Sequence, residues 1–258
     1  MEIHVINLKE AVDRRKSIES QLQKLQLSYK IFDAVRGSAL SENELNELVD
    51  MDEVRKYPNW LTPNMLGCSL SHMGVYKRMC ISKEEWHLVL EDDVIIDSDL
   101  EVILTNIEIN GDTFKGHLLL LYCVSHNSTI KLGHVPIKKI EGKGVYELLN
   151  PKSIGSTGAY VIHRDTAKLL VEKNAKIRVA PDTWHYFRDQ KALGDIYCVY
   201  PFAARPGFFE STIGYINTKS FVFKVKSFIE KYKIPILYSL LKLNRKKVWK
   251  ETSRVEFK

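Results

Sequence analysis

Short apolar runs alternate with amphipathic stretches along most of this chain. The run from Ile3 to Leu8 predicts a first strand, and apolar positions then recur at helical spacing from about Val12 to Leu27. The run from Tyr29 to Val35 predicts a second strand. This strand–helix–strand order is typical of an α/β sheet, whose ligands bind beyond the carboxyl ends of the strands.

A longer helix is predicted to begin at Thr62, because this cap residue is followed by Pro63 in the first turn. Gly67 and Gly74 lie inside the predicted helix, where each glycine is unfavourable by roughly 1 kcal/mol relative to alanine. Close packing of another segment against the helix would explain both. Residues 58–60, which precede it, are predicted to form a surface loop.

The run from Leu88 to Ile96 predicts a buried strand that contains three consecutive carboxylates, Glu91, Asp92 and Asp93. A buried charge is costly unless it is paired or holds a metal ion, so we expect these residues at the strand's end. Alternation would place Glu91 and Asp93 on one face and Asp92 on the other. Two hard oxygen ligands suit Mg²⁺ or Mn²⁺ carrying a substrate phosphate. The alternative is an acidic strand end that faces water.

Later apolar runs predict strands within residues 118–124, 159–162 and 196–200. Residues 131–146 contain several glycines and a proline, which indicates hairpin or loop structure. Pro181 and Asp182 are predicted to begin a short helix.

With 258 residues the chain can form one sizeable domain, with or without an appendage. Its net charge of +6 is uneven, because residues 219–250 hold ten basic residues and one acid. The part before Lys219 is therefore mildly acidic. We expect a catalytic domain over residues 1–218 and a basic C-terminal segment over residues 219–258.

Apolar residues alternate with lysines in this basic segment, and Pro235 divides it into two predicted helical pieces. Such a basic amphipathic segment suits the anionic inner leaflet of a membrane, where each Lys or Arg contributes roughly 1 kcal/mol. The alternative is a terminal helix packed on the core with a solvated basic side. Nucleic-acid binding is disfavoured, since the body is acidic and lacks base-reading motifs.

The four cysteines are widely spaced in predicted core elements, which favours reduced thiols and a cytosolic protein. Charged residues follow the first apolar run too soon for a signal peptide, and no stretch of about 18 apolar residues occurs. We therefore expect a cytoplasmic protein that is peripheral on the inner face of the cytoplasmic membrane.

Several separated motifs follow one known order. They are Ile6-Asn7-Leu8 with Arg14-Arg15, Ala34-Val35-x-Gly37, Gly67-Cys68-x-x-Ser71-His72 and Leu90-Glu91-Asp92-Asp93, with weaker matches at 158–162 and Pro181-Asp182. On these motifs the chain resembles glycosyltransferase family 25, the bacterial lipopolysaccharide and lipo-oligosaccharide glycosyltransferases typified by β-galactosyltransferases. The resemblance covers roughly residues 1–211.

The resemblance implies an α/β GT-A fold, in which a nucleotide-binding mixed sheet is flanked by helices. It implies transfer of a hexose, galactose, from a UDP-sugar (UDP-galactose) to a glycan or glycolipid acceptor, with inversion at the anomeric carbon. The family's metal motif corresponds to Glu91-x-Asp93, served by Mn²⁺ (or Mg²⁺). Asp93 is then the direct metal ligand, while Glu91 holds the ribose or a metal-bound water.

The residues expected to bind the nucleotide sugar are Asn7, Leu8, Arg14, Ala34, Arg36, Ser71, His72, Glu91 and Asp92. Family members commonly carry Asp at the position of Arg36. Asp182 is the expected general base, which takes a proton from the acceptor hydroxyl; the alternative for Asp182 is a helix N-cap. His185 is a further candidate metal ligand. The competing function is a non-catalytic module that binds sugar nucleotides or membranes on the same fold.

Overall fold

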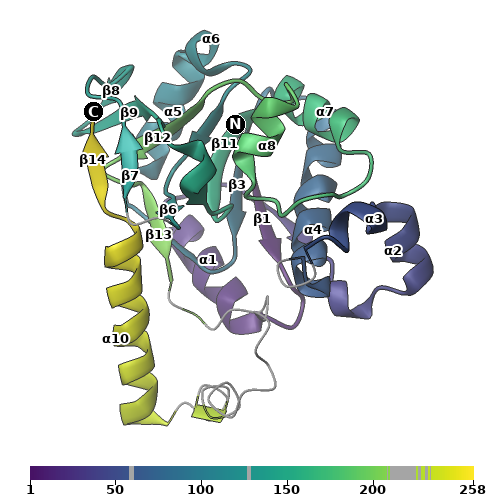
Figure 1. The fold of residues 1–258 in the computed structure, drawn as a ribbon. Helices are drawn as coiled ribbons and strands as arrows, with labels where there is room; N and C mark the ends of the chain where they lie inside the picture. Colours follow the sequence, from purple (N-terminus) through teal and green to yellow (C-terminus); the bar gives the residue numbers. More distant parts are fainter. Residues whose placement is uncertain are drawn as a thin grey trace.

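The computed structural model describes residues 1–57, 61–126, 129–207 and 234–258, together with residues 209, 225, 228, 229 and 232. Its main strands are β1 (Glu2–Asn7), β2 (Lys30–Asp33), β3 (Trp86–Glu91), β5 (Leu118–Leu120), β8 (Lys138–Ile140), β9 (Lys143–Glu147), β11 (Ala159–His163) and β12 (Ile196–Tyr200). In this part of the chain they form one eight-stranded sheet in the order β2-β1-β3-β11-β5-β12-β9-β8 (Figure 1).

The sheet is mixed. β1 lies parallel to both β2 and β3, so the carboxyl ends of these three strands meet at one edge. β11 runs antiparallel to its neighbours β3 and β5, while β12 is parallel to β5 and antiparallel to β9. The hairpin predicted within residues 131–146 is confirmed by the antiparallel pair of β8 and β9.

Among the described residues, three strand pairs lie outside the large sheet. β4 (Val94–Ile96) pairs with β13 (Ala204–Pro206), β6 (Val124–Ser125) with β10 (Ile154–Gly155), and β7 (Ile130–Leu132) with β14 (Val255–Phe257). The predicted strand 88–96 is therefore two strands, because a turn at Asp92 and Asp93 separates β3 from β4. The run 118–124 is likewise split between β5 and β6.

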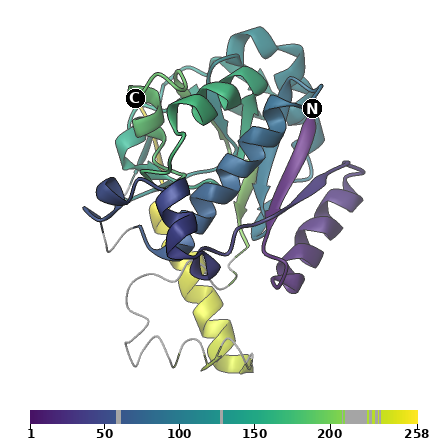
Figure 2. The ribbon, with the colours of Figure 1, turned by 90° about the vertical axis from the view of Figure 1, so that its right-hand side faces the viewer.

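Helices cover both faces of the sheet, and Figure 2 shows α4 (Pro63–Cys80) lying across one of them. Val89 of β3 joins the core beneath α4 and α7 (Arg164–Lys173). Leu88 and Leu90 join the core formed with α1 (Val12–Lys24) and α5 (Leu100–Ile109). This alternation explains why the strand is apolar throughout. The helices are α1 (Val12–Lys24), α2 (Glu42–Leu48), α3 (Met51–Val54), α4 (Pro63–Cys80), α5 (Leu100–Ile109), α6 (Gly111–Phe114), α7 (Arg164–Lys173), α8 (Trp184–Asp189) and α10 (Pro235–Thr252), with 3-10 turns at Gly37–Ala39 and Pro151–Ser153.

Both glycines of α4 are sites of close packing, as predicted. A Cβ atom on Gly67 would lie 2.5 Å from the backbone nitrogen of Gly37 and 2.5 Å from the carbonyl oxygen of Val35. A Cβ atom on Gly74 would lie 2.3 Å from the Phe32 ring. The helix therefore approaches the end of β2 and the loop after it more closely than any side chain would allow.

The basic segment is described from residue 234 onward, apart from four isolated residues before it. α10 begins at Pro235, as predicted, and Figure 1 shows it extending away from the sheet. Trp249 packs edge-on to Tyr122, and β14 pairs with β7, so the far end of the segment is joined to the body. The proposed boundary at residues 218 and 219, the first predicted helical piece and the loop at 58–60 lie outside the described residues.

Within the described ranges no helix combines the length and hydropathy needed to cross a bilayer. All four cysteines are free thiols. Cys123, which follows β5, and Cys198 of β12 are distant in sequence, but their sulfur atoms lie 3.9 Å apart.

Candidate active site

A cleft of about 750 Å³ opens at the carboxyl ends of β1, β2 and β3. The place is the one expected for an α/β sheet, because strand ends and the loops after them converge there. Predicted binding residues from four separate segments line it: Leu8, Arg14, Ala34, Arg36, Ser71, Glu91 and Asp92.

Asn7 is buried and contacts Asp92, which lines the cleft. The Asn7 side-chain amide donates a 2.7 Å hydrogen bond to Oδ2 of Asp92, and Nη1 of Arg14 donates a 3.0 Å bond to Oδ1. Both Asp92 oxygens are therefore occupied by residues of β1 and α1. Burial raises the pKa of the Asp92 carboxyl, although Arg14 and Asn7 act in the opposite direction.

Asp93 shares Arg14 with Asp92, since its Oδ2 lies 3.3 Å from the same guanidinium nitrogen. The predicted opposite orientation of Asp92 and Asp93 is therefore wrong, because β3 ends at Glu91 and both aspartates belong to the turn. Burial and the charges of Glu91 and Asp92 raise the pKa of Asp93 to about 7.

Asp92 and Asp93 thus share one guanidinium, and the carboxylate of Glu91 adjoins them in the sequence. Such an excess of negative charge in a partly buried place fits a divalent cation, and hard oxygen donors are the ligands that Mn²⁺ and Mg²⁺ favour. The donor set of Glu91 and Asp93 is chemically suited to the metal that the sequence motif implies.

Glu91 turns toward α4 and the loop before β11. Its Oε1 accepts a 2.5 Å hydrogen bond from the Thr157 hydroxyl and lies 3.4 Å from Nε2 of His72. Burial pushes the pKa of Glu91 upward, but His72 and Thr157 outweigh it and hold the pKa below its ordinary value. Candidate ligand atoms of Cys68, His72 and Glu91 all lie within 4.8 Å of one another.

His72 is held from its other side, because its Nδ1 shares a 2.8 Å hydrogen bond with the hydroxyl of Tyr160. It borders a separate small cavity of about 20 Å³ instead of the main cleft. His185 belongs to neither of the candidate metal clusters found among the described residues.

Asp182 is not the cap of α8. The N-cap position is Thr183, and Oδ2 of Asp182 instead accepts a 3.2 Å hydrogen bond from the backbone N–H of Ser156. Burial raises the pKa of Asp182, and the charge of Glu91 adds to the effect. Asp182 does not line the main cleft, but it is connected to Glu91 through the loop 155–158.

This loop has unusual backbone geometry. Ser156 has a φ of 105°, a value that residues other than glycine rarely adopt, and its carbonyl accepts a 3.1 Å bond from the Trp184 indole. A Cβ atom on Gly155 would lie 2.6 Å from Nε2 of His126 and 2.8 Å from Oδ2 of Asp182. Strained backbone of this kind is concentrated at functional sites.

Two further cleft residues could not be recognised in the sequence. Phe209 lies with its ring centroid 5.8 Å from the Arg14 guanidinium carbon, and Tyr238 reaches the cleft from α10. Both are brought there by tertiary structure, and neither belongs to a motif. Thr157 directly precedes the motif at 158–162, but nothing in its spacing indicated a bond to Glu91.

Ser71 and Arg36 shape the wall formed by the loop after β2. The Ser71 hydroxyl accepts a 2.8 Å hydrogen bond from the backbone N–H of Val35 and donates a 2.7 Å bond to the carbonyl of Gly67. Arg36 forms an ion pair with Glu10 on the opposite wall. The side chains of Ser71, Arg36 and Glu10 thus connect neighbouring parts of the cleft's wall.

The sequence profile of glycosyltransferase family 25, described as an LPS biosynthesis protein family, matches residues 1–185. The chain belongs to this family. The predicted resemblance is thereby confirmed, and the mixed sheet flanked by helices agrees with the predicted GT-A-type fold class.

Two relatives illustrate the range of the family. The chain is 31% identical over 186 residues to procollagen galactosyltransferase 2 of Homo sapiens, a match that covers 70% of this chain and 29% of the relative. It is 25% identical over 169 residues to the lipooligosaccharide biosynthesis protein lic2B of Haemophilus influenzae, covering 65% and 61%. The chain thus spans less than a third of the procollagen galactosyltransferase.

Among solved structures, the chain is similar to a glycosyltransferase involved in the glycosylation of the major capsid of PBCV-1. The match has a TM-score of 0.39 and 12% identity, and it covers 81% of this chain and 83% of the other.

Proposed function

We propose that this chain is a metal-dependent glycosyltransferase that transfers a hexose, galactose, from a UDP-sugar to a glycan acceptor, with inversion at the anomeric carbon. The acceptor belongs to lipopolysaccharide or lipo-oligosaccharide biosynthesis. The observation that carries this proposal is the cleft itself, which gathers four family motifs and an excess of carboxylates at one sheet edge.

Asp93 and Glu91 would hold the Mn²⁺ (or Mg²⁺) ion. When bound, the ion supplies positive charge that neutralises the leaving diphosphate. Arg14 already contacts both aspartates, with its Nη1 3.0 Å from Oδ1 of Asp92 and 3.3 Å from Oδ2 of Asp93. Leu8, Ala34, Arg36 and Ser71 line the part of the cleft proposed for the nucleotide.

Asp182 is proposed to act as the base. Its carboxylate takes the proton from the acceptor hydroxyl while that oxygen forms a bond to the anomeric carbon. The bond from the anomeric carbon to the diphosphate oxygen breaks, and UDP leaves with the electron pair. The raised pKa of Asp182 strengthens it as a proton acceptor, while the Ser156 N–H keeps its carboxylate in position.

The direct test measures UDP release from UDP-galactose with and without a glycoside acceptor, in Mn²⁺ and in EDTA. We expect release that depends on both acceptor and metal. Asp93→Asn is expected to abolish transfer and weaken Mn²⁺-dependent UDP binding while the fold is retained. Full activity in EDTA would exclude the metal, and wild-type activity of Asp93→Asn would exclude its assigned role.

A non-catalytic sugar-nucleotide or membrane-binding module remains the second candidate. It is favoured by one similarity, to the inactive glycosyltransferase 25 family member 3 of Homo sapiens, at 30% identity over 115 residues that cover 42% of this chain and 19% of the relative. Binding of UDP without release from any UDP-hexose in an acceptor screen would support this candidate.

The exposed side of α10 supports a peripheral position on the inner face of the cytoplasmic membrane. Leu240 and Leu243 are more than half exposed there, beside Lys246 and Lys247. An exposed row of apolar side chains flanked by lysines suits an anionic lipid surface. Since Tyr238 of the same helix lines the cleft, a glycolipid acceptor would meet the active site at that surface.

A further inference from the structure

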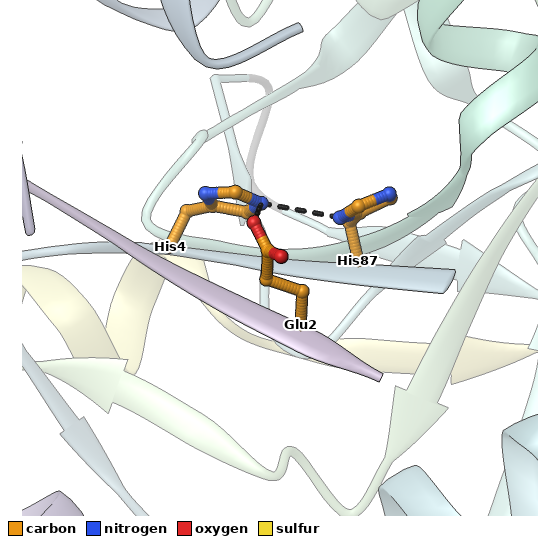
Figure 3. A group of neighbouring side chains, drawn as sticks. All are labelled: Glu2, His4 and His87. Carbon is orange, nitrogen blue, oxygen red and sulfur yellow. Dashed lines mark hydrogen bonds and ion pairs between the residues drawn. The ribbon is translucent and has the colours of Figure 1, made fainter. Parts of the chain in front are cut away.

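Three potential metal ligands lie at the opposite end of β1 and β3 from the cleft. Glu2 and His4 occupy alternate positions on β1, so their side chains share one face of the sheet. In the parallel pairing, Glu2 lies opposite His87 of β3. The register therefore brings two imidazoles and a carboxylate together, as Figure 3 shows.

The distances between the ligand atoms match those around a small metal ion. Nε2 of His4 lies 3.1 Å from Nδ1 of His87 and 3.2 Å from Oε1 of Glu2. A tetrahedral Zn²⁺ ion with bonds of about 2.0 to 2.1 Å separates neighbouring ligand atoms by roughly 3.3 Å. One ion can therefore be accommodated with small side-chain movements.

Two of the three ligands are already oriented by outer partners. The second carboxylate oxygen of Glu2 accepts hydrogen bonds of 2.8 Å from Lys30 and 3.2 Å from the Ser82 hydroxyl. Nε2 of His87 lies 3.1 Å from the carbonyl of Glu84, to which it donates. Such contacts fix ligand orientation in protein metal sites, and here they leave Oε1 of Glu2 and Nδ1 of His87 directed at His4.

Both imidazoles are fully buried and present lone pairs at neutral pH. His4 and His87 are both 0% exposed, and such burial disfavours the charged imidazolium. Neutral imidazole is the form that binds metals. Nε2 is the nitrogen of His4 that faces Glu2 and His87, and therefore the one that would bind the ion.

We propose that Glu2, His4 and His87 form a second metal site, specific for a d-block divalent cation such as Zn²⁺, which fastens β1 to β3. Two nitrogens and one oxygen favour zinc, whereas the oxygen donors of Glu91 and Asp93 favour Mn²⁺ or Mg²⁺. Three protein ligands leave one tetrahedral position for water. The site is independent of the proposed transferase activity, because it lies at the other end of the strands.

The test uses the full chain stripped of metal and titrated with ZnCl₂ against a chromophoric chelator. Asp93→Asn serves as the background and removes the proposed metal ligand of the cleft, and the variants below separate this site from the group of Cys68, His72 and Glu91. We expect one zinc per chain, and a Tm rise of roughly 5 to 10 °C at about one hundred times Kd. Cobalt in place of zinc is expected to give the visible absorption of a tetrahedral N,O site.

His87→Gln and Glu2→Gln, each in the same background, are expected to weaken zinc binding at least about tenfold. His117→Gln is the matched control, because this histidine lies outside the cluster and is expected to leave binding unchanged. If either cluster variant misfolds, the cobalt spectrum and zinc-dependent Tm of the folded background protein still decide the matter. The proposal would be overturned if the background protein showed neither the cobalt absorption nor the zinc-dependent rise in Tm. It would also be overturned if His87→Gln bound zinc as tightly as its background does.

Discussion

Replacing Gly67 by alanine tests whether the contact between α4 and the loop 35–37 builds the cleft. In an unconstrained helix interior this change stabilises by roughly 1 kcal/mol, because alanine has the higher helix propensity. Here the new Cβ atom would lie 2.5 Å from two backbone atoms of the loop, at Val35 and Gly37. Neither backbone atom can rotate away as a side chain could.

Overpacking in a close-packed interior lowers the free energy of unfolding by about 1 to 3 kcal/mol. The upper part of this range is expected here, because the new Cβ atom would meet backbone atoms that cannot move aside. Subtracting the helix-propensity gain leaves a net loss of roughly 2 kcal/mol. For a domain of this size that corresponds to a fall in Tm of roughly 4 to 8 °C. The displaced loop lines the cleft, so UDP affinity is also expected to fall.

Urea unfolding followed by circular dichroism measures the stability, and calorimetric titration measures UDP binding. Gly133→Ala is the control, since its Cβ atom would meet nothing closer than 3.8 Å and the variant is expected to unfold like the wild type. If Gly67→Ala proved as stable as the wild type with unchanged UDP affinity, close packing at this position would not be what the cleft requires.

Three further outcomes are expected. Asp182→Asn should lower the rate of transfer by about 10² or more while donor binding is preserved. Transfer by the wild type should decline as the pH falls through the raised pKa of Asp182, because protonation removes the base. If Asp182→Asn changed only the Tm, the role of Asp182 would be structural. Thr157→Val removes the hydroxyl that stabilises charged Glu91, so the pKa of Glu91, followed by NMR titration of its carboxyl carbon, should rise, and an unchanged pKa would contradict the role of Thr157. The double variant Lys246→Glu, Lys247→Glu should bind anionic vesicles at least about tenfold more weakly and transfer to a soluble acceptor as the wild type does. Vesicle binding equal to that of the wild type would contradict a membrane role for α10.

The sequence predicted the local features of the fold well. The strand–helix–strand start, the helix beginning at Pro63, the closely packed glycines and the position of Glu91 at a strand's end all follow from nearest-neighbour chemistry and periodicity. These properties are determined within a few residues, so the pattern of apolar positions contains them.

Features that depend on distant contacts could not be predicted in the same way. Strict alternation failed at Asp92 and Asp93, because the turn that ends β3 is required by the separate pairing of β4 with β13. Tyr238 lines the cleft because Trp249 and the pairing of β14 with β7 join this part of the chain to the body. The basic segment was expected as an appendage, and its charge pattern contains no sign of that pairing.

The loop between β10 and β11 carries a consequence for how such a scaffold can diversify. The backbone N–H of Ser156 donates to Asp182, and the hydroxyl of the next residue, Thr157, donates to Glu91. The spacing of the two carboxylates therefore depends on one peptide unit, whose Cα atoms are about 3.8 Å apart. Any insertion or deletion there would shift one carboxylate against the other by a whole residue. Phe209 and Tyr238 also line the cleft but lie outside this loop, so substitutions there leave the spacing of the two carboxylates unchanged.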